Sequence, residues 1–270
     1  MVYANPIEEE LASGKYYDRL GTPFYLSPDK LQSDYAPVRF ERELRLFRKY
    51  CPQGSVLDVG CSTGAFLYQL GKTGAYQTTG TDVASEALDH AASQGIKVIR
   101  ESFLTRDFAD TRYDAITFWA VLEHLAEPAE FIQKALGLLK PGGHCFILVP
   151  NVKSLAIRIC GSKYRYVMPD HLNYFSAAHM QSFVCGPGPV ETVHIGSSHF
   201  NPIVIWQDLR GGANRVADAD RAKLLKKTTA MKQKPWLRPV KFLYRMAESG
   251  LNLFGLGDNL VLVVRKLPTC

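Results

Sequence analysis

The sequence predicts an α/β fold built on a parallel β-sheet, and three observations support this. Residues 55–70 carry a short apolar strand at 56–59, a turn with glycine at both ends and an apolar helix that begins near Thr63. Further apolar strands alternate with helical patterns along the chain, which is typical of a parallel sheet covered by helices. Finally, 270 residues that are 46% hydrophobic suffice for one large domain, or for one domain with a cap.

The turn after the first strand is the strongest candidate for a binding site. Gly60 and Gly64 lie at its ends, and glycine lets a backbone approach a ligand closely. The free N–H groups at the start of the next helix favour an anionic group. Asp58 would repel a diphosphate, and Ser62 replaces the middle glycine of the dinucleotide fingerprint. A zwitterionic ligand, with an ammonium and a carboxylate, therefore fits this turn better than a dinucleotide.

The next elements continue the alternation of strands and helices. Helices are predicted to begin near Ser85 and at Pro128, since proline is favourable at a first helical position. Asp82 closes the second strand about 20 positions after the turn, where an acidic side chain can accept hydrogen bonds from both ribose hydroxyls. The second to fifth strands are predicted at 78–83, 97–101, 113–118 and 144–149.

Five motifs follow one another in the order and spacing of one enzyme family. They are Asp58-Val-Gly-Cys-Ser-Thr-Gly64, Gly80-Thr-Asp82, Tyr113-Asp-Ala-Ile-Thr-Phe118, Leu122-Glu-His124 and Leu139-Lys-Pro-Gly-Gly143. On these residues the chain resembles the class I S-adenosylmethionine-dependent methyltransferases. It is most similar to the branch of the ubiquinone-biosynthesis O-methyltransferases and related small-molecule enzymes. The likeness covers residues 55–151 and returns at 171–176 and 257–264. It implies a Rossmann-like seven-stranded sheet flanked by helices, with an N-terminal arm and an inserted helical cap.

The resemblance also implies S-adenosylmethionine as cofactor and S-adenosylhomocysteine as product. Ser102 stands where the family usually has an acidic residue near the adenine, and Phe103 is expected either against the adenine or in the core. Trp119 is expected as a wall of the cofactor pocket. An N-terminal arm commonly closes over the cofactor in such enzymes, so Tyr16 or Tyr17 either hydrogen-bonds the cofactor or packs the arm onto the sheet. The complete set expected to contact the cofactor is Asp58, Gly60, Cys61, Ser62, Gly64, Asp82, Val83, Ser102, Phe103, Trp119, Ala120, Tyr16 and Tyr17.

Two histidines are candidates for a general base. His124 follows the fourth strand, where residues line the crevice of such a sheet, and imidazole titrates near neutral pH. The alternative is that His124 bonds to the backbone and shapes the loop. His171 is the second candidate because resembling enzymes carry a His-Leu-x-x-Phe-Ser run near the acceptor; a structural hydrogen bond is its alternative. The expected reaction is methyl transfer to an oxygen or nitrogen, in which the protein mainly aligns two reactants.

Three regions are predicted from the spacing of the elements. Residues 1–50 form an N-terminal arm and helix, residues 51–199 and 257–270 form the cofactor-binding domain, and residues 200–256 form a basic cap. The cap follows from the connection between the last two strands, at 190–195 and 260–264, which is too long for a hairpin.

The cap also holds the excess positive charge of the chain. Residues 210–245 contain 11 basic and 2 acidic side chains, whereas the rest of the chain sums to −3. A first helix is predicted over 215–230, and a second helix is lined by Trp236, Leu237, Val240, Leu243 and Ala247. Such a surface suits an acidic or amphiphilic acceptor, a membrane surface or nucleic acid, or it is a solvated charged face. Because no RNA-binding module is recognisable, nucleic acid is the weakest of these.

Composition and residue spacing bear on membrane insertion, secretion and metal binding. No run of about 18 uncharged apolar residues occurs, so no transmembrane helix is expected. The N-terminus does not read as a secretory signal. The six cysteines are scattered and the histidines lack ligand spacing, which argues against a metal and for free thiols in the cytoplasm.

The sequence thus predicts a methyltransferase acting on a small-molecule acceptor. A glycan or lipid-linked acceptor is the alternative. An NAD-dependent oxidoreductase and a non-catalytic cofactor-binding scaffold are the other classes, and Asp58 with the missing middle glycine argues against NAD.

Overall fold

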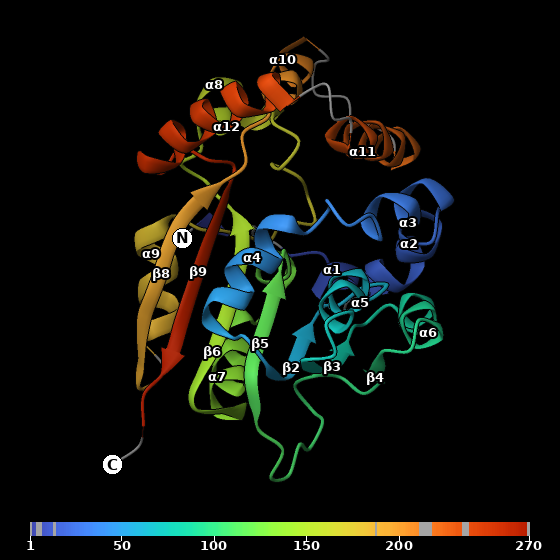
Figure 1. The fold of residues 1–270 in the computed structure, drawn as a ribbon, viewed down its shortest axis with the longest axis vertical. Coiled ribbons are helices and arrows are strands. Elements are labelled where there is room, and N and C mark those ends of the chain that lie inside the picture. Colours follow the sequence, from blue (N-terminus) through green and yellow to red (C-terminus); the bar gives the residue numbers. More distant parts are fainter. Residues whose placement is uncertain are drawn as a thin grey trace.

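A seven-stranded β-sheet lies at the centre of the computed structural model, which describes residues 2–3, 7–12, 15–186, 188–210, 218–233 and 238–268. The strand order is β4-β3-β2-β5-β6-β9-β8 (Figure 1). β9 runs antiparallel to both of its neighbours, and all other neighbours pair in parallel. The strands are β2 (Gly54–Val59), β3 (Tyr76–Thr81), β4 (Lys97–Ile99), β5 (Tyr113–Trp119), β6 (Leu139–Pro150), β8 (Val190–Ser198) and β9 (Asn259–Lys266). The predicted α/β fold is confirmed.

Helices cover both faces of this sheet. On one face α7 and α9 pack on a core that contains Ile132 and Met180, and on the other face α4, α5 and α6 pack on a core that contains Phe47, Leu67 and Leu88. The helices are α1 (Glu9–Ala12), α2 (Lys15–Tyr25), α3 (Pro28–Asp34), α4 (Glu41–Tyr50), α5 (Ala65–Gly71), α6 (Ser85–Ser93), α7 (Pro128–Leu138), α8 (Leu155–Cys160), α9 (Ala177–Cys185), α10 (Pro202–Arg210), α11 (Asp218–Gln233) and α12 (Arg238–Leu253). Short 3₁₀ helices, η1 (Leu122–His124) and η2 (Gly161–Lys163), follow β5 and α8.

The N-terminal arm is more regular than its turn-rich sequence indicates. It contains α1, α2 and α3, and β1 (Val2–Tyr3) pairs with β7 (Asn173–Tyr174) in a separate two-stranded sheet. That pairing brings the start of the chain to the 171–176 segment. It could not be read from the local pattern, because two-residue strands carry too little periodicity.

The segment between β8 and β9 is helical, as expected, and is tied to the N-terminal part of the chain. The Ser33 and Thr229 hydroxyls are 2.8 Å apart, and Lys226 pairs with Asp29, so α11 is fixed to α3. Arg42 and Glu248 form an ion pair between α4 and α12. α4, placed above in the first region together with the arm, packs into the core of the sheet. The three-region division therefore stays a prediction.

Part of the predicted second cap helix lies outside the residues that the structure describes. Trp236 and Leu237 lie outside the described residues, as do the side chains of Val240 and Leu243, while Ala247 is exposed. Among the helices that the structure describes, none has the length and apolar content to cross a membrane.

Candidate active site

The glycine turn joins β2 to α5 at the carboxyl edge of the sheet. Gly60 and Gly64 have φ angles of 76° and 77°. A β-carbon at Gly60 would lie 2.4 Å from Cγ2 of Val121, and one at Gly64 would lie 2.4 Å from Cδ1 of Ile96. Both positions are therefore restricted to glycine by conformation and by packing. Ser62, between them, adopts φ of 50° without being glycine, which is a strained conformation.

Gly64→Ala is expected to lower the free energy of unfolding by about 2–3 kcal/mol, because the new methyl meets Ile96 in a left-handed conformation. Gly71 in α5 is the matched control, since nothing lies within 4 Å of a β-carbon there. Gly71→Ala should change stability by less than about 1 kcal/mol. Urea unfolding of both variants measures this, and equal destabilisation would contradict the packing argument.

Asp82 lies beside the turn at the end of β3. Its carboxylate accepts hydrogen bonds from the backbone N–H groups of Ser62, at 2.7 Å, and Ala84, at 2.9 Å. Burial raises the pKa of Asp82, and these two hydrogen bonds oppose that rise. The adjacent Val83 side chain is 59% exposed. A carboxylate that can accept hydrogen bonds and an exposed apolar side chain thus lie next to each other at the carboxyl edge of the sheet.

Asp58, at the end of β2, is buried. Its Oδ1 accepts a hydrogen bond from the Thr117 hydroxyl at 2.6 Å. The pKa of Asp58 is raised to about 7, because burial and the charge of Asp82 raise it by more than the Thr117 hydrogen bond lowers it. Asp58 is therefore only partly ionised at neutral pH unless a cation lies near it.

Two of the aromatic residues predicted near the cofactor pack against core side chains. The Phe103 ring is buried and stacks on Phe131, with ring centroids 5.4 Å apart, which disfavours its contact with adenine. Trp119 is half-buried and packs against Phe66 and Phe146 on the α4 and α5 face, and its place in the wall of a cofactor pocket stays a prediction. The strong hydrophobicity of both rings explains these positions.

The other predicted contacts lie around the turn. Cys61 is buried, and its Sγ would be 2.6 Å from a β-carbon at Gly80, so this thiol fills space behind the turn. Ser102 is exposed beyond the end of β4. Ala120 has a positive φ of 59° and donates its N–H to the Leu148 carbonyl. That conformation directs the chain after β5 back over Gly60.

The two candidate histidines lie in contact. The His124 and His171 rings have centroids 4.7 Å apart in an edge-to-face arrangement. Residues from β7 and from the loop before it hold η1 in place, since the Asn173 amide donates to the carbonyls of Leu122 and Leu125, and the Leu172 N–H donates to the Glu123 carbonyl. His124 lies three residues after Val121, which packs on Gly60. The histidine pair is thereby connected to the glycine turn.

Hydrogen bonds indicate which ring nitrogen of His124 carries a proton. Nδ1 lies 2.8 Å from the Asp170 carbonyl oxygen, which can only accept, so Nδ1 carries the proton. The Tyr17 hydroxyl lies 2.8 Å from the same Nδ1 and 3.3 Å from the same carbonyl. Nε2 is consequently the nitrogen that can accept a proton. The Asp170 carboxylate, 3.9 Å from Nδ1, would stabilise the resulting cation.

Tyr17 was predicted as a cofactor contact, and the structure places its hydroxyl on His124. Burial, followed by the charge of Asp170, raises the pKa of Tyr17, so the phenol stays neutral. Tyr16 packs edge-to-face on Tyr17. The arm thus reaches the histidine pair, and a role in orienting His124 is better supported than a hydrogen bond to the cofactor.

Three residues at this edge escaped the sequence reasoning. Asp170 and Glu123 directly precede His171 and His124 in the sequence. This adjacency to the predicted histidines was the only feature of the sequence that pointed to them. Tyr35 donates its hydroxyl to the Thr63 carbonyl at 2.5 Å and so fastens the arm to the glycine turn. An isolated tyrosine in a polar segment gave no signal for that contact.

Glu123, His124 and His171 also form a cluster of metal-ligand type. One ligand atom from each lies within 4.8 Å of the others. Glu123 is buried, its Oε2 has no hydrogen-bond partner among the described residues, and burial raises its pKa to about 8. The lack of metal-ligand spacing in the sequence is therefore no argument against a metal at this site, because the fold brings His171 next to residues far from it in the chain. A metal-free site stays a prediction.

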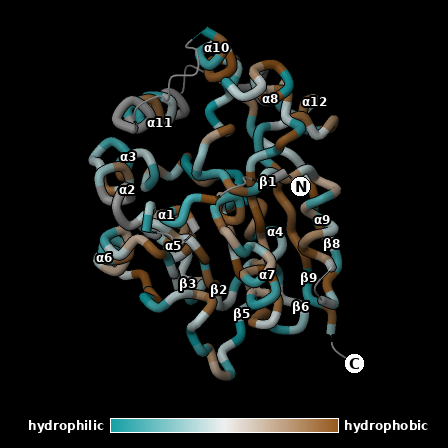
Figure 2. Tube along the Cα trace, turned by 180° about the vertical axis from the view of Figure 1, so that it is seen from behind, coloured by the Kyte–Doolittle hydropathy of each residue, from teal (hydrophilic) through white to brown (hydrophobic). Residues whose placement is uncertain are grey.

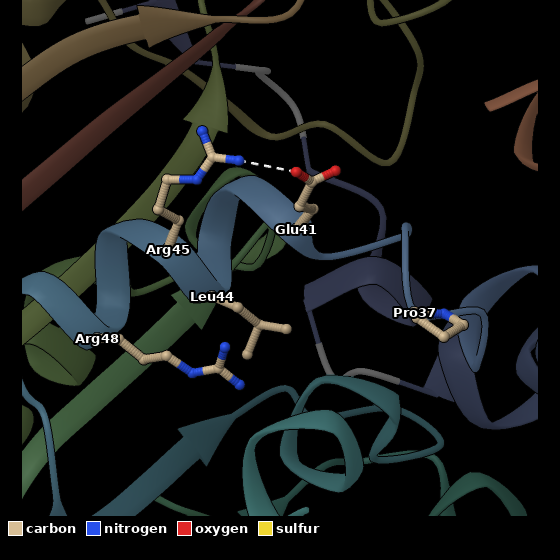
Figure 3. A pocket seen from close by; sticks show the side chains of 5 residues that line it. All are labelled: Pro37, Glu41, Leu44, Arg45 and Arg48. Carbon is tan, nitrogen blue, oxygen red and sulfur yellow. Dashed lines mark hydrogen bonds and ion pairs between the residues drawn. The ribbon is translucent and has the colours of Figure 1, made fainter. Parts of the chain in front are cut away.

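Two surface hollows lie apart from this cluster. One, of about 320 Å³, lies beside α4 and is lined by Pro37, Glu41, Leu44, Arg45 and Arg48 (Figure 3). Two of these side chains, Glu41 and Arg45, form an ion pair. The other, of about 790 Å³, opens at the amino ends of β2, β3 and β5, opposite the glycine turn. Neither contains a residue of the predicted site.

Comparisons with known proteins agree with this geometry. Residues 33–184 match a family model described as a methyltransferase domain. The ubiquinone biosynthesis O-methyltransferase of Serratia proteamaculans is 32% identical over 194 residues, which cover 64% of this chain and 79% of that protein. A solved structure from Thermotoga maritima, described as a SAM-dependent methyltransferase and possible histamine N-methyltransferase, aligns with a TM-score of 0.59 at 14% identity over 93% of this chain and 98% of that one. The plantazolicin methyltransferase BpumL, solved with a desmethyl analogue and SAH, aligns with a TM-score of 0.54 at 18% identity over 96% and 98%. At such identities the two structures show a shared fold.

Proposed function

Because this chain belongs to the class I S-adenosylmethionine-dependent methyltransferases, we propose that it methylates a hydroxyl group of a small-molecule acceptor, with His124 as the general base. The enzyme class and the cofactor follow from the family. The name of the Serratia relative supports an oxygen atom as the methyl acceptor.

The residues at the carboxyl edge fit the cofactor. Asp82 would accept hydrogen bonds from the ribose hydroxyls, the exposed Val83 side chain would lie against the adenine, and Asp58 with the turn after Gly60 would hold the amino-acid end. When bound, S-adenosylmethionine supplies a methyl group that is already activated by the sulfonium charge. The protein therefore needs chiefly to align the acceptor and to remove its proton, and alignment alone is worth about 7–11 kcal/mol of the barrier.

The contact of His124 with Tyr17, Asp170 and His171 is the observation that carries this proposal. The Asp170 carbonyl accepts a hydrogen bond from Nδ1, so Nε2 is the nitrogen that would take the proton of an acceptor hydroxyl. The Asp170 carboxylate then stabilises the imidazolium. His171 packs edge-on against the His124 ring and positions it, and remains the second candidate for the base.

The test is the pH dependence of His124→Ala. Loss of a general base is expected to lower kcat by about 10²–10⁴-fold and to remove the rise of rate with pH through the range of imidazole titration. Affinity for S-adenosylhomocysteine should change less than threefold. His179→Ala, an exposed histidine on α9, is the control and should behave as wild type.

A normal pH profile in His124→Ala would remove His124 as the base, and loss of the profile only in His171→Ala would move that role to His171. The same assays include a chelator. Activity that is abolished by EDTA and restored by a divalent cation would assign Glu123, His124 and His171 to a metal instead.

A glycan or lipid-linked acceptor is the second candidate. Exposed apolar side chains beside exposed basic ones on α8 and α10 favour an amphiphilic acceptor over a fully polar one. A cytoplasmic location is likewise proposed, supported by the five cysteines in the described residues, all of which are free thiols.

A further inference from the structure

α10 is apolar on two opposite faces. Val204, Ile205 and the paired Asp208 are buried against the body of the protein. At 100° per residue, the other face carries Ile203, 58% exposed, and Trp206, 54% exposed, in one stripe. The same stripe continues through Leu209, 44% exposed, to Arg210. The hydrophobic residues of this stripe contribute nothing to the core, so packing within the chain does not explain them.

Other large apolar side chains are exposed on elements at the same end of the molecule. α8 packs against α10 through the cluster that contains Cys160 and Ile205, and exposes Ile159. Leu253 and Phe254, at the end of α12, are 85% and 80% exposed. Figure 1 shows α8, α10 and α12 together at the end of the molecule beyond the carboxyl edge of the sheet, and Figure 2 shows hydrophobic segments in α8 and α10 there.

At this end of the molecule the acidic side chains are buried and the exposed charged side chains are basic. Across the described residues of 151–170, 199–210 and 244–254, the acidic side chains are buried, and Asp208 and Glu248 are paired with Arg165 and Arg42. The exposed charges in the same ranges are basic and include Arg158, Lys163 and Arg210. The Arg210 guanidinium lies over the Trp206 ring, 4.2 Å from its centroid. An apolar surface with cations beside it, and without exposed anions, is complementary to an anionic lipid surface.

We propose that the surface formed by α8, α10 and the end of α12 binds membranes that contain anionic lipids. Ile203, Trp206 and Leu209 enter the interface between head groups and acyl chains, where the amphipathic indole is favoured. Arg158, Lys163 and Arg210 contact lipid phosphates. Because this surface lies at the same end as the site, a bound molecule would receive an amphiphilic acceptor from the membrane. The proposal concerns binding alone and does not depend on the identity of the reaction.

Co-sedimentation with lipid vesicles tests this. The full chain is mixed with vesicles of phosphatidylcholine containing 30% phosphatidylglycerol, and with vesicles of phosphatidylcholine alone, at physiological salt. Wild type is expected to bind the anionic vesicles at least tenfold more tightly. Trp206→Ser with Leu209→Ser should weaken this binding at least tenfold, because two interfacial anchors are lost. Arg210→Gln should weaken it about fivefold on anionic vesicles only.

Ile195→Ser on β8 is the control, since Ile195 is similarly exposed but lies on an edge strand outside this surface, and its binding should equal that of wild type. Calorimetry with S-adenosylhomocysteine establishes that each variant is folded. Vesicle binding that is absent in wild type, or unchanged in the double variant, overturns the proposal. A wild-type dimer that the double variant dissociates, without vesicle binding, also overturns it and assigns the surface to a second copy. Loss of methyl transfer with normal vesicle binding would affect only the proposed function.

Discussion

Replacing Asp82 by alanine is expected to weaken S-adenosylhomocysteine binding about 100-fold or more. Each hydrogen bond from a ribose hydroxyl to a carboxylate is worth about 1.5 kcal/mol or more, and two of them give about 3 kcal/mol, or two orders of magnitude. The substitution also removes the acceptor for the Ser62 and Ala84 N–H groups, so the glycine turn loses its anchor to β3. Isothermal calorimetry measures the affinity, and thermal unfolding without ligand measures the structural contribution.

Asp82→Asn separates these two effects. Its remaining carbonyl oxygen can still accept one of the backbone N–H groups, but its amide group repels a hydroxyl proton that the carboxylate would accept. Because one of the two backbone N–H groups keeps its acceptor, we expect a smaller loss of stability in the unliganded protein than Asp82→Ala causes, with a strong loss of affinity. If both variants unfold early yet bind with wild-type affinity, Asp82 anchors the turn and does not contact the ribose.

The sequence predicted the sheet edge better than the surroundings of the histidines. Gly60, Gly64 and Asp82 act through their own backbone and side chain at the end of a strand, so local pattern and spacing suffice to locate them. The contact of His124 with Tyr17 and Asp170 joins residues 107 and 46 positions apart. No periodicity carries such information, because it depends on how the N-terminal arm and the β7 segment fold over η1.

Aromatic side chains were the least predictable. Phe103 and Trp119 occupy positions at strand ends, where a ring can face either a ligand or the core. Phe103 takes the core, which was one of its two expected places, and the half-buried Trp119 packs against core side chains. Transfer of a large ring from water is favourable wherever neighbours allow it, and Phe131, Phe66 and Phe146 provide those neighbours from other elements. The sequence shows that an aromatic ring follows the strand, but it does not show whether that ring packs into the core or faces a ligand.

The second large effect is expected for Asp58→Asn in the unliganded protein, where stability should increase at pH 8. The carboxyl of Asp58 is buried and its pKa is raised to about 7, so the folded protein holds this proton more tightly than the unfolded chain does. Wild-type stability is therefore unaffected by Asp58 below about pH 4 and falls as the pH rises toward 7. Asparagine removes this penalty, which amounts to about 2–4 kcal/mol at pH 8, and its Oδ1 can still accept the Thr117 hydrogen bond.

Asp114→Asn is the control of opposite sign. Burial would raise the pKa of Asp114, but hydrogen bonds from Lys140 and Ser55 outweigh it and hold the pKa below its usual value. This variant should be less stable than wild type at neutral pH and approach it in acid. Urea unfolding at several pH values compares the two. Destabilisation of Asp58→Asn at pH 8 would show that its carboxylate is stabilised in the fold without a ligand.

Ligand binding is expected to lower the raised pKa of Asp58. An ammonium group near the carboxylate lowers its pKa, so binding at neutral pH releases a proton, and wild-type affinity for S-adenosylhomocysteine should rise between pH 5 and pH 8. Asp58→Asn has no proton to release and should bind weakly, with little dependence on pH over this range. Calorimetry in buffers of different ionisation enthalpy counts the proton directly. Proton release that persists in Asp58→Asn would place it on another group and would remove Asp58 as the partner of the ammonium.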